Sequence, residues 1–234
     1  MARIVVIIPA FNERPGIEDV VRRVLKLGLP VVVVDDGSTD GTGLPLMDLP
    51  VELIVHQRNQ GKGEAIRSGI RRALKDGADA AVFLDADGQH IPEEIPRLVD
   101  AFATTGADLI VGSRMGEPKG MPLVRRLSNR TSSVVVSGLA GTWVTDSQSG
   151  FRLLSRKAMG VVLMQESGGF ELESDMIIEL VRQGMVYLEV PITCRYGSEV
   201  SHYRPWRDAR RFMALVLKKA RGRFGSPHST GGKS

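Results

Sequence analysis

The chain has 234 residues, of which 42% are hydrophobic and 25% charged, with a formal net charge of +4 at pH 7. This composition is that of an ordinary globular protein with one sizeable core. No segment approaches the roughly 20 consecutive apolar residues of a membrane-spanning helix. Pro9, Asn12 and Glu13 interrupt the opening apolar stretch too early for a secretory signal. The single cysteine, Cys194, excludes an intramolecular disulfide and favours a cytoplasmic location.

Basic residues are concentrated near the C-terminal end of the chain. Between Arg195 and Ser234 there are ten lysines and arginines against two acidic residues. Such a segment indicates an anionic partner, either a membrane surface or a phosphate-bearing substrate. Nucleic acid is not an expected partner, because aromatic residues are sparse here and no nucleic-acid-binding module is recognisable.

Apolar, β-branched runs alternate with amphipathic segments through the first half of the chain. Buried strands are predicted at RIVVIIPA, PVVVVDDGS, VELIVHQ, AAVFLDAD and ADLIVGSR. Helices are predicted between them over 17–27, 63–76 and 92–104. Because the strands are continuous Val/Ile/Leu runs, they must be covered on both faces, which predicts an α/β fold with a mostly parallel sheet flanked by helices.

The pattern loosens after Arg114, where a polar loop containing Gly and Pro precedes the next helix. We predict helices over 127–139 and 174–183, a short strand and helix in SGFRLLSRKAM, and a late strand in MVYLEVPITCRYG. The chain is expected to form one domain over 1–206, a basic amphipathic helix over 207–222 and a disordered tail over 223–234.

Polar side chains follow the predicted strand ends. In parallel sheets, ligands bind beyond the carboxyl ends of the strands, so these side chains should converge on one edge. They are Asn12, Asp35, Asp36, Asp85, Asp87 and Arg114. The D-x-D pair, Asp85 and Asp87, can hold Mg²⁺ or Mn²⁺ through carboxylate oxygens, especially where substrate phosphates complete the coordination shell. The sequence therefore predicts a metal and phosphate site at this edge.

Six stretches occur along the chain in this order: VVIIPAFNE, VVVVDDGSTDGT, RNQGKGEAIRSGI, FLDADGQH, GSR and DSQSGFRLLSR. Together they resemble the family 2 glycosyltransferases, and in particular the dolichol- and polyprenyl-phosphate mannose or glucose synthases. The resemblance spans residues 4 to about 201. It implies a GT-A fold and an inverting transfer of a sugar from a nucleotide sugar, such as GDP-mannose or UDP-glucose, to a polyprenyl or dolichyl phosphate.

The resemblance also implies roles for individual residues. The nucleotide-sugar site would be formed by Pro9, Phe11, Glu13, Asp36, Lys62, Asp85 and Ala86. The metal would be held by Asp85, Asp87 and Gln89. The catalytic residues would be Asp87, Arg114 and Asp146. The acceptor phosphate would be bound by Arg114, Arg125, Gln148 and Arg195.

Several of these side chains also fit structural roles. Phe11 could belong to the core, and Lys62 could face solvent rather than the nucleotide. Either Arg125 or Arg126 could be the arginine that points inward. Asp146 could act as a general base toward an alcohol acceptor, or could stabilise a turn, whereas a lipid phosphate is already an anionic nucleophile and needs no base.

Two histidines and the last helix leave further alternatives. His90 fits a structural role in the turn better than a ligand role, and His202 stands where the synthases commonly have lysine, which weakens the inference for the segment around Arg195 and His202. The helix over 207–221 could dock on anionic lipid at the cytoplasmic face of a membrane, or pack on the core with its basic face exposed.

Other functions fit the sequence less well. A soluble or glycan alcohol acceptor would require no change of fold. A nucleotidyltransferase would need a glycine-rich loop with a basic residue directly after the first strand, where this chain reads PAFNE. A sugar-binding module without activity would leave the metal and nucleotide stretches unexplained.

Overall fold

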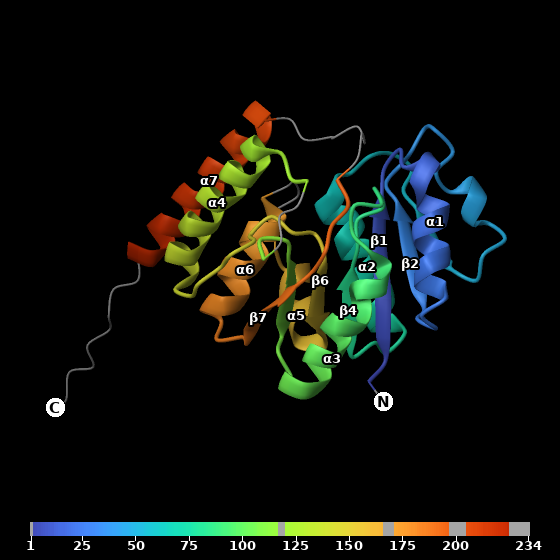
Figure 1. Ribbon diagram of the computed structural model, residues 1–234, viewed down its shortest axis with the longest axis horizontal. Coiled ribbons are helices and arrows are strands. Elements are labelled where there is room, and N and C mark those ends of the chain that lie inside the picture. Colours follow the sequence, from blue (N-terminus) through green and yellow to red (C-terminus); the bar gives the residue numbers. More distant parts are fainter. Residues whose placement is uncertain (1, 117–119, 166–170, 197–204, 225–234) are drawn as a thin grey trace.

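A computed structural model describes residues 2–116, 120–165, 171–196 and 205–224 of the chain. Its centre is one sheet of seven strands in the order β3-β2-β1-β4-β6-β5-β7 (Figure 1). In chain order the strands are β1 (Ile4–Ala10), β2 (Val31–Asp35), β3 (Glu52–Val55), β4 (Ala80–Phe83), β5 (Leu109–Ser113), β6 (Arg152–Ser155) and β7 (Tyr187–Pro191). All of these run parallel except β6, which lies antiparallel between β4 and β5. The predicted mostly parallel α/β sheet is confirmed.

Helices cover both faces of the sheet. One layer contains α1 (Arg14–Leu25) and α3 (Ile95–Thr105), and the other contains α2 (Lys62–Lys75), α5 (Arg156–Leu163) and α6 (Leu172–Arg182). Successive side chains of β1 alternate between the two cores, so Val6 is buried with the α1 layer and Ile7 with the α2 layer. This double burial explains why the strands are continuous apolar runs rather than alternating ones.

Prolines shift two of the predicted helix boundaries. The helix predicted over 92–104 divides into a short 3₁₀ turn, η2 (Pro92–Glu94), and α3. The reason is Pro96, which has no N–H to donate to the carbonyl of Pro92, so one continuous α-helix would lose that bond. The next helix, α4 (Leu123–Ala140), begins directly after Pro122, one turn before the predicted start at residue 127.

The last helix, α7 (Pro205–Phe224), lies alongside α4 at the edge of the molecule (Figure 1). Leu215 is buried, and Phe212 packs against the α2-side core. The Lys219 ammonium lies 2.7 Å from both Asp175 Oδ1 and Glu179 Oε2 on α6. One side of α7 therefore packs on the core. This is one of the two arrangements considered for the last helix.

Some predictions fall outside what the structure describes. They are the role of His202 and the disordered tail from residue 225 onward. Among the helices of the described ranges, none combines the length and apolar character that crossing a bilayer requires.

The direction of the strand order reverses between β1 and β4. From β1 the chain moves outward to β2 and β3, then returns to place β4 on the other side of β1. Ligands of open α/β sheets bind at such a switch point, beyond the carboxyl ends of the strands. Segment 9–13, which includes the last two residues of β1, and the D-x-D turn after β4 both lie there.

Candidate functional site

Lys62 joins two acidic side chains at the switch point. Its ammonium lies 2.8 Å from Asp85 Oδ1 and 2.7 Å from Glu173 Oε1. Burial alone would lower the pKa of Lys62, but the two carboxylates outweigh burial and raise it. For Asp85 the effects are reversed: burial would raise its pKa, but the charges of Lys62 and His90 hold it at about 2. The Lys62 ammonium thus points toward the D-x-D turn rather than into solvent, and its contact with the nucleotide stays a prediction.

A glycine allows a backbone segment to approach Asp85. A Cβ atom built on Gly150 would lie 2.3 Å from Asp85 Oδ2, far inside the contact distance of real atoms. Gly150 belongs to the loop between α4 and β6. The absence of a side chain at position 150 therefore lets this loop pass directly over Asp85 without displacing its carboxylate.

The D-x-D turn makes its own contacts through Gln89. Asp87 Oδ1 accepts a 2.9 Å hydrogen bond from the Gln89 backbone N–H, and Gln89 Oε1 accepts one of 3.2 Å from Arg125 Nη1. The Arg195 N–H donates to the Gln89 carbonyl at 2.9 Å. Arg125 is therefore directed at the turn and also lies over the ring of Tyr196, 5.8 Å from its centroid. Both arginines are exposed, and it is the hydrogen bond to Gln89 that directs Arg125 to the turn.

His90 is buried beneath the same turn. Its ring centroid lies 5.4 Å from that of Phe151, its backbone forms an isolated bridge with Cys194, and its Nδ1 lies 3.9 Å from Asp85 Oδ2. Burial is the largest influence on its pKa, which falls to about 4. Nδ1 has no hydrogen-bond partner within the described part of the chain. This packing is consistent with the structural role expected for His90.

Arg114 is held by a completely buried carboxylate. Asp146 Oδ2 accepts from both the backbone N–H and Nε of Arg114, at 3.0 and 2.8 Å, and Oδ1 accepts from Nη2 at 2.8 Å. Oδ1 also accepts from Asn129 Nδ2 at 2.8 Å. Burial would raise the pKa of Asp146, but the Arg114 charge outweighs burial and lowers it. The carboxylate therefore remains ionised with both oxygens engaged.

The second acidic turn, after β2, is also engaged with the backbone. Asp36 Oδ1 accepts from His56 Nδ1 at 2.7 Å and from the Gln60 N–H at 2.9 Å, while Oδ2 accepts from the Gly61 N–H at 2.7 Å. Asp35 Oδ1 accepts from the Ser38 N–H at 2.9 Å. Asp36 thus fixes the loop that leads to Lys62 and lies at the predicted edge.

The remaining predicted residues lie around this edge at different depths. Ala86 is buried, Arg195 has an exposed side chain, and the others are partly buried, namely Pro9, Phe11, Glu13 and Gln148. Asn12, which has a φ of 57°, connects the loop after β1 with the loop after β2. Its N–H donates to Ser38 Oγ and its Oδ1 accepts from the Thr39 N–H, both at 2.9 Å.

The turn supplies few ligands for a metal. Within the described residues there is no group of three or more His, Cys, Asp or Glu side chains placed to hold an ion. Asp85 and Asp87 would provide carboxylate oxygens, and Gln89 an amide oxygen. This set suits Mg²⁺ or Mn²⁺ when one or two carboxylates act together with substrate phosphates, which is how Mg²⁺ is usually bound. These residues fit such an ion when substrate phosphates complete its coordination.

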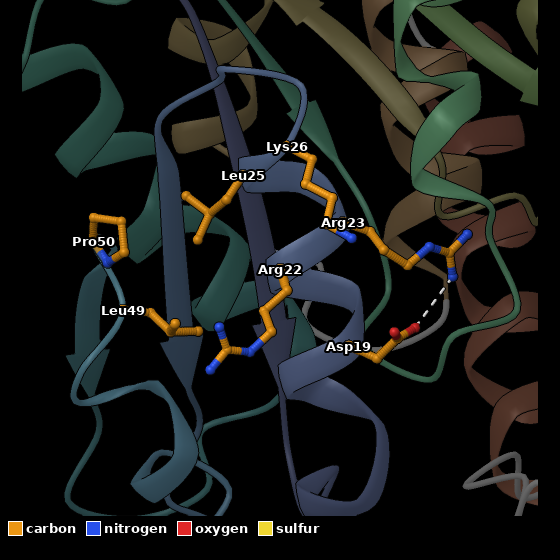
Figure 2. Close-up of a pocket in the computed structure, with 7 residues that line it drawn as sticks. All are labelled: Asp19, Arg22, Arg23, Leu25, Lys26, Leu49 and Pro50. Carbon is orange, nitrogen blue, oxygen red and sulfur yellow. Dashed lines mark hydrogen bonds and ion pairs between the residues drawn. The ribbon is translucent and has the colours of Figure 1, made fainter.

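A pocket of about 400 Å³ lies elsewhere, against the C-terminal half of α1 (Figure 2). It is lined in part by Arg22, Arg23 and Lys26. Arg22 is paired with Glu18, and Arg23 with Asp19 and Glu93. Because α1 starts next to the switch point and runs away from it, this pocket is at the opposite end of the sheet and has no part in the site.

Comparison with known proteins identifies the chain. Residues 5–163 match the family described as Glycosyl transferase family 2. The chain belongs to glycosyltransferase family 2. This glycosyltransferase is 34% identical over 215 residues to the UDP-N-acetylglucosamine--dolichyl-phosphate N-acetylglucosaminyltransferase of Methanococcus voltae, covering 82% of this chain and 86% of that protein. It is 34% identical over 204 residues to the polyprenol monophosphomannose synthase of Mycolicibacterium smegmatis, covering 82% and 77%.

Solved structures place the glycosyltransferase in the GT-A fold. Glucosyl-3-phosphoglycerate synthase from Mycobacterium tuberculosis, crystallised with Mn²⁺, UDP and phosphoglyceric acid, has a TM-score of 0.71 at 22% identity. The alignment covers 99% of this chain and 82% of that one. Mannosyl-3-phosphoglycerate synthase from Rubrobacter xylanophilus has a TM-score of 0.62 at 14% identity. At these identities the likeness concerns the fold alone.

Sequence reasoning missed three residues of the glycosyltransferase site. Glu173 belongs to GGFELESD, a stretch that resembles a block lining the sugar pocket, but no role was assigned to it; it is buried beside Lys62, and its Oε2 has no hydrogen-bond partner in the described residues. Gly150 was part of a recognised stretch but had no assigned reason. Arg152 is completely buried and donates to the carbonyls of Ser149, Glu173 and Ser147, at 2.6, 2.5 and 2.9 Å. The sequence did contain a signal for Arg152, because a basic residue at the start of an apolar strand indicates a buried side chain with hydrogen-bond partners.

Proposed function

We propose that this glycosyltransferase transfers a sugar, with inversion, from a nucleotide sugar of the GDP-mannose or UDP-glucose type to a polyprenyl or dolichyl phosphate. The observation that supports the acceptor is the pair of guanidiniums beside the D-x-D turn. Arg114 is close enough to influence the pKa of Asp85, and Arg125 contacts Gln89. The forked N–H donors of Arg125 would match the oxygens of a phosphate monoester, whereas Arg114, whose Nε and Nη2 are bonded to Asp146, would offer its remaining N–H groups. The relatives from Methanococcus and Mycolicibacterium are named for acceptors of this class.

The donor site would lie at the switch point. Segment 9–13 and Asp36 would border the nucleoside, with Ala86 beneath it. A divalent cation held by Asp85, Asp87 and Gln89 would supply positive charge to the diphosphate when bound. Lys62, fixed by Asp85 and Glu173, adds a second positive charge on the same side. Mn²⁺ is present in the glucosyl-3-phosphoglycerate synthase crystals, which supports the metal class without distinguishing Mg²⁺ from Mn²⁺.

The chemical step would be a single displacement. An oxygen of the acceptor phosphate forms a bond to the anomeric carbon, and the bond from that carbon to the nucleoside diphosphate oxygen breaks on the opposite face. Arg114 and Arg125 would hold the phosphate in line, and Gln148 and Arg195 lie on the same side. Orientation of this kind can supply much of the barrier reduction. The leaving diphosphate departs with its charge countered within the site.

Asp146 has a different role in this proposal from the one considered first. A general base needs a free lone pair and a pKa near the working pH. Both oxygens of Asp146 accept hydrogen bonds from Arg114, and its pKa is lowered. We therefore assign Asp146 to positioning Arg114. This fits a phosphate acceptor, which is already ionised and needs no base.

A transfer assay tests the proposal. The full chain would be incubated with Mn²⁺ or Mg²⁺, labelled GDP-mannose, UDP-glucose or UDP-N-acetylglucosamine, and a polyprenyl phosphate in detergent. Label that partitions into organic solvent supports the proposal. Label found only in water-soluble product would indicate the soluble acceptor instead. The D87A variant should lose turnover, and unchanged turnover in D87A would overturn the metal role.

The residues around Arg125 offer a matched control. R125A should raise the KM for polyprenyl phosphate, because a contact with the acceptor is lost, while R126A should leave KM near the wild-type value. Equal effects of the two substitutions would remove the support that Arg125 gives to the acceptor assignment. Because the proposed acceptor is a lipid, the enzyme would work at the cytoplasmic face of a membrane.

A further inference from the structure

A chain of hydrogen bonds behind the second acidic turn links Asp36 to His56 and Ser68. His56 directly follows β3, and Ser68 lies in the middle of α2. The His56 ring stands between the other two side chains, with Nδ1 2.7 Å from Asp36 Oδ1 and Nε2 2.9 Å from Ser68 Oγ. The side chains of His56 and Asp36 are only 8% and 3% exposed, so water competes little for these bonds.

Asp36 determines which nitrogen of the His56 ring carries a proton. The carboxylate already accepts from the backbone N–H groups of Gln60 and Gly61, at 2.9 and 2.7 Å, so it also acts as an acceptor toward the ring. Nδ1 is therefore the donor to Asp36. Nε2 of the neutral ring then accepts from the Ser68 hydroxyl. Ser68 thus holds His56 in the tautomer that directs an N–H at Asp36.

The backbone around this chain fixes the direction of the Asp36 carboxylate. The His56 N–H donates to the Asp35 carbonyl at 2.9 Å, directly beyond the pairing of β2 with β3. A Cβ atom built on Gly37 would lie 2.4 Å from the backbone carbonyl carbon of Arg58, so the loops after the two strands pass each other backbone to backbone. The carboxylate is therefore oriented before any ligand binds.

The contacts of Asp36 leave one acceptor position for a ligand. The two oxygens of a carboxylate offer about four lone-pair sites. Oδ1 accepts from His56 and from Gln60, which fills its share, whereas Oδ2 accepts from Gly61 alone. Within the described part of the chain, the remaining position is therefore on Oδ2. A ligand with two adjacent N–H groups would have one of them without an acceptor here.

We propose that this single position selects a nucleotide sugar with uracil as its base over one with guanine, and that His56 and Ser68 are positioning residues for the selection. In the proposed function, on which this inference rests, Asp36 borders the nucleoside. Uracil presents one ring N–H, at N3, between two carbonyl oxygens, which matches one acceptor. Guanine presents N1–H and an amino N–H side by side, which match a carboxylate with both oxygens available. A buried N–H left without an acceptor weakens binding.

Calorimetry of the full chain with Mn²⁺ and a nucleoside diphosphate tests the selection. The probes are UDP, GDP and CDP. We expect UDP to bind roughly tenfold more tightly than GDP, and by a similar factor more tightly than CDP, because N3 of cytosine carries no hydrogen. CDP is the matched ligand, since it shares the pyrimidine ring, the ribose and the diphosphate with UDP. Affinities for GDP or CDP that equal or exceed the affinity for UDP would overturn the selection.

Two substitutions of His56 test its positioning role. The amide nitrogen of asparagine is as many bonds from the backbone as Nδ1, and that of glutamine is as many as Nε2. H56N should therefore keep the bond to Asp36 and prefer UDP as the wild type does. H56Q should free a position on Oδ1 and reduce the preference for UDP over GDP by about threefold or more. S68A should shift the preference in the same direction by less.

The ratio of the two affinities separates positioning from a merely structural role. If His56 only stabilised the loops, H56Q would weaken the binding of UDP and GDP alike, and an unchanged ratio would overturn the positioning role. A melting curve shows whether H56Q is folded. The wild-type affinities need no variant, so they test the selection of uracil whether or not H56Q folds.

The transfer assay separates this inference from the proposed function. Label that reaches the organic phase from GDP-mannose, but from neither UDP-glucose nor UDP-N-acetylglucosamine, would support the function and overturn the selection of uracil. Selective binding of UDP, without transfer to polyprenyl phosphate from any of these donors, would support the selection and overturn the proposed acceptor.

Discussion

The Arg114 guanidinium and the Asp146 carboxylate face each other in the buried interior, joined by two side-chain hydrogen bonds of 2.8 Å each. Asp146 follows α4 in sequence and Arg114 follows β5, so the pair joins two loops of the site. A bidentate pair fixes the plane of the guanidinium as well as its position. Breaking a buried pair by removing one partner leaves an uncompensated charge, which usually costs about 3–5 kcal/mol.

We expect D146N to lower the free energy of unfolding by about 3 kcal/mol or more, because the buried Arg114 loses its counter-charge. We expect kcat/KM to fall about 100-fold, because Arg114 would no longer be held in place. Urea denaturation and steady-state kinetics measure the two effects. D100N, at an exposed position on α3, is the control for loss of a carboxylate. In a double-mutant cycle with R114M, additive effects would contradict the pairing.

Lys62 is predicted to stabilise two acids at once. K62M should lower the free energy of unfolding by about 3 kcal/mol, because buried Glu173 and the partly buried Asp85 then repel each other without a counter-ion. K62R, which keeps the charge, should recover part of the loss. The control is K75M at the exposed end of the same helix, which should change stability by less than about 0.5 kcal/mol. A K62M protein as stable as K75M would show that the ammonium is not required.

Much of the site could be predicted because it depends on strand ends. Asp85 and Asp87 stand directly after a recognisable buried strand, and the geometry of parallel sheets brings such residues to one edge whatever the details of packing. Lys62 and Arg125 remained open, because their direction depends on contacts with Glu173 and Gln89 that are distant in sequence. Residue type alone does not report such contacts.

Other features could not be read from local pattern. Gly150 resembles any turn glycine until Asp85 is found against its backbone. The start of α4 was predicted one turn late because periodicity assigns apolar residues to the core, and on this helix Leu123 and Val124 face outward.

The close approach at Gly150 gives a prediction about the D-x-D turn. In G150A the new Cβ must displace Asp85 Oδ2 or move the loop, since the two would lie 2.3 Å apart. We expect Mn²⁺ affinity in the presence of nucleoside diphosphate to fall at least tenfold, measured by calorimetry. The matched control is G160A, an exposed helical position with nothing within 4 Å of its Cβ. G160A should bind Mn²⁺ normally and gain about 0.5–1 kcal/mol of stability.

His90 predicts how stability changes with pH. Burial holds its pKa at about 4 in the folded chain, below the usual 6.5, so the unfolded chain takes up the proton first as pH falls. Stability contributed by neutral His90 is therefore complete above pH 6.5 and is lost progressively down to pH 4. Between pH 7 and pH 5 the loss should be about 2 kcal/mol. The H90Q variant cannot titrate in this range, so urea denaturation without divalent cations should show a correspondingly smaller decrease. Equal decreases in both proteins would mean that the buried ring is protonated as readily as an exposed one.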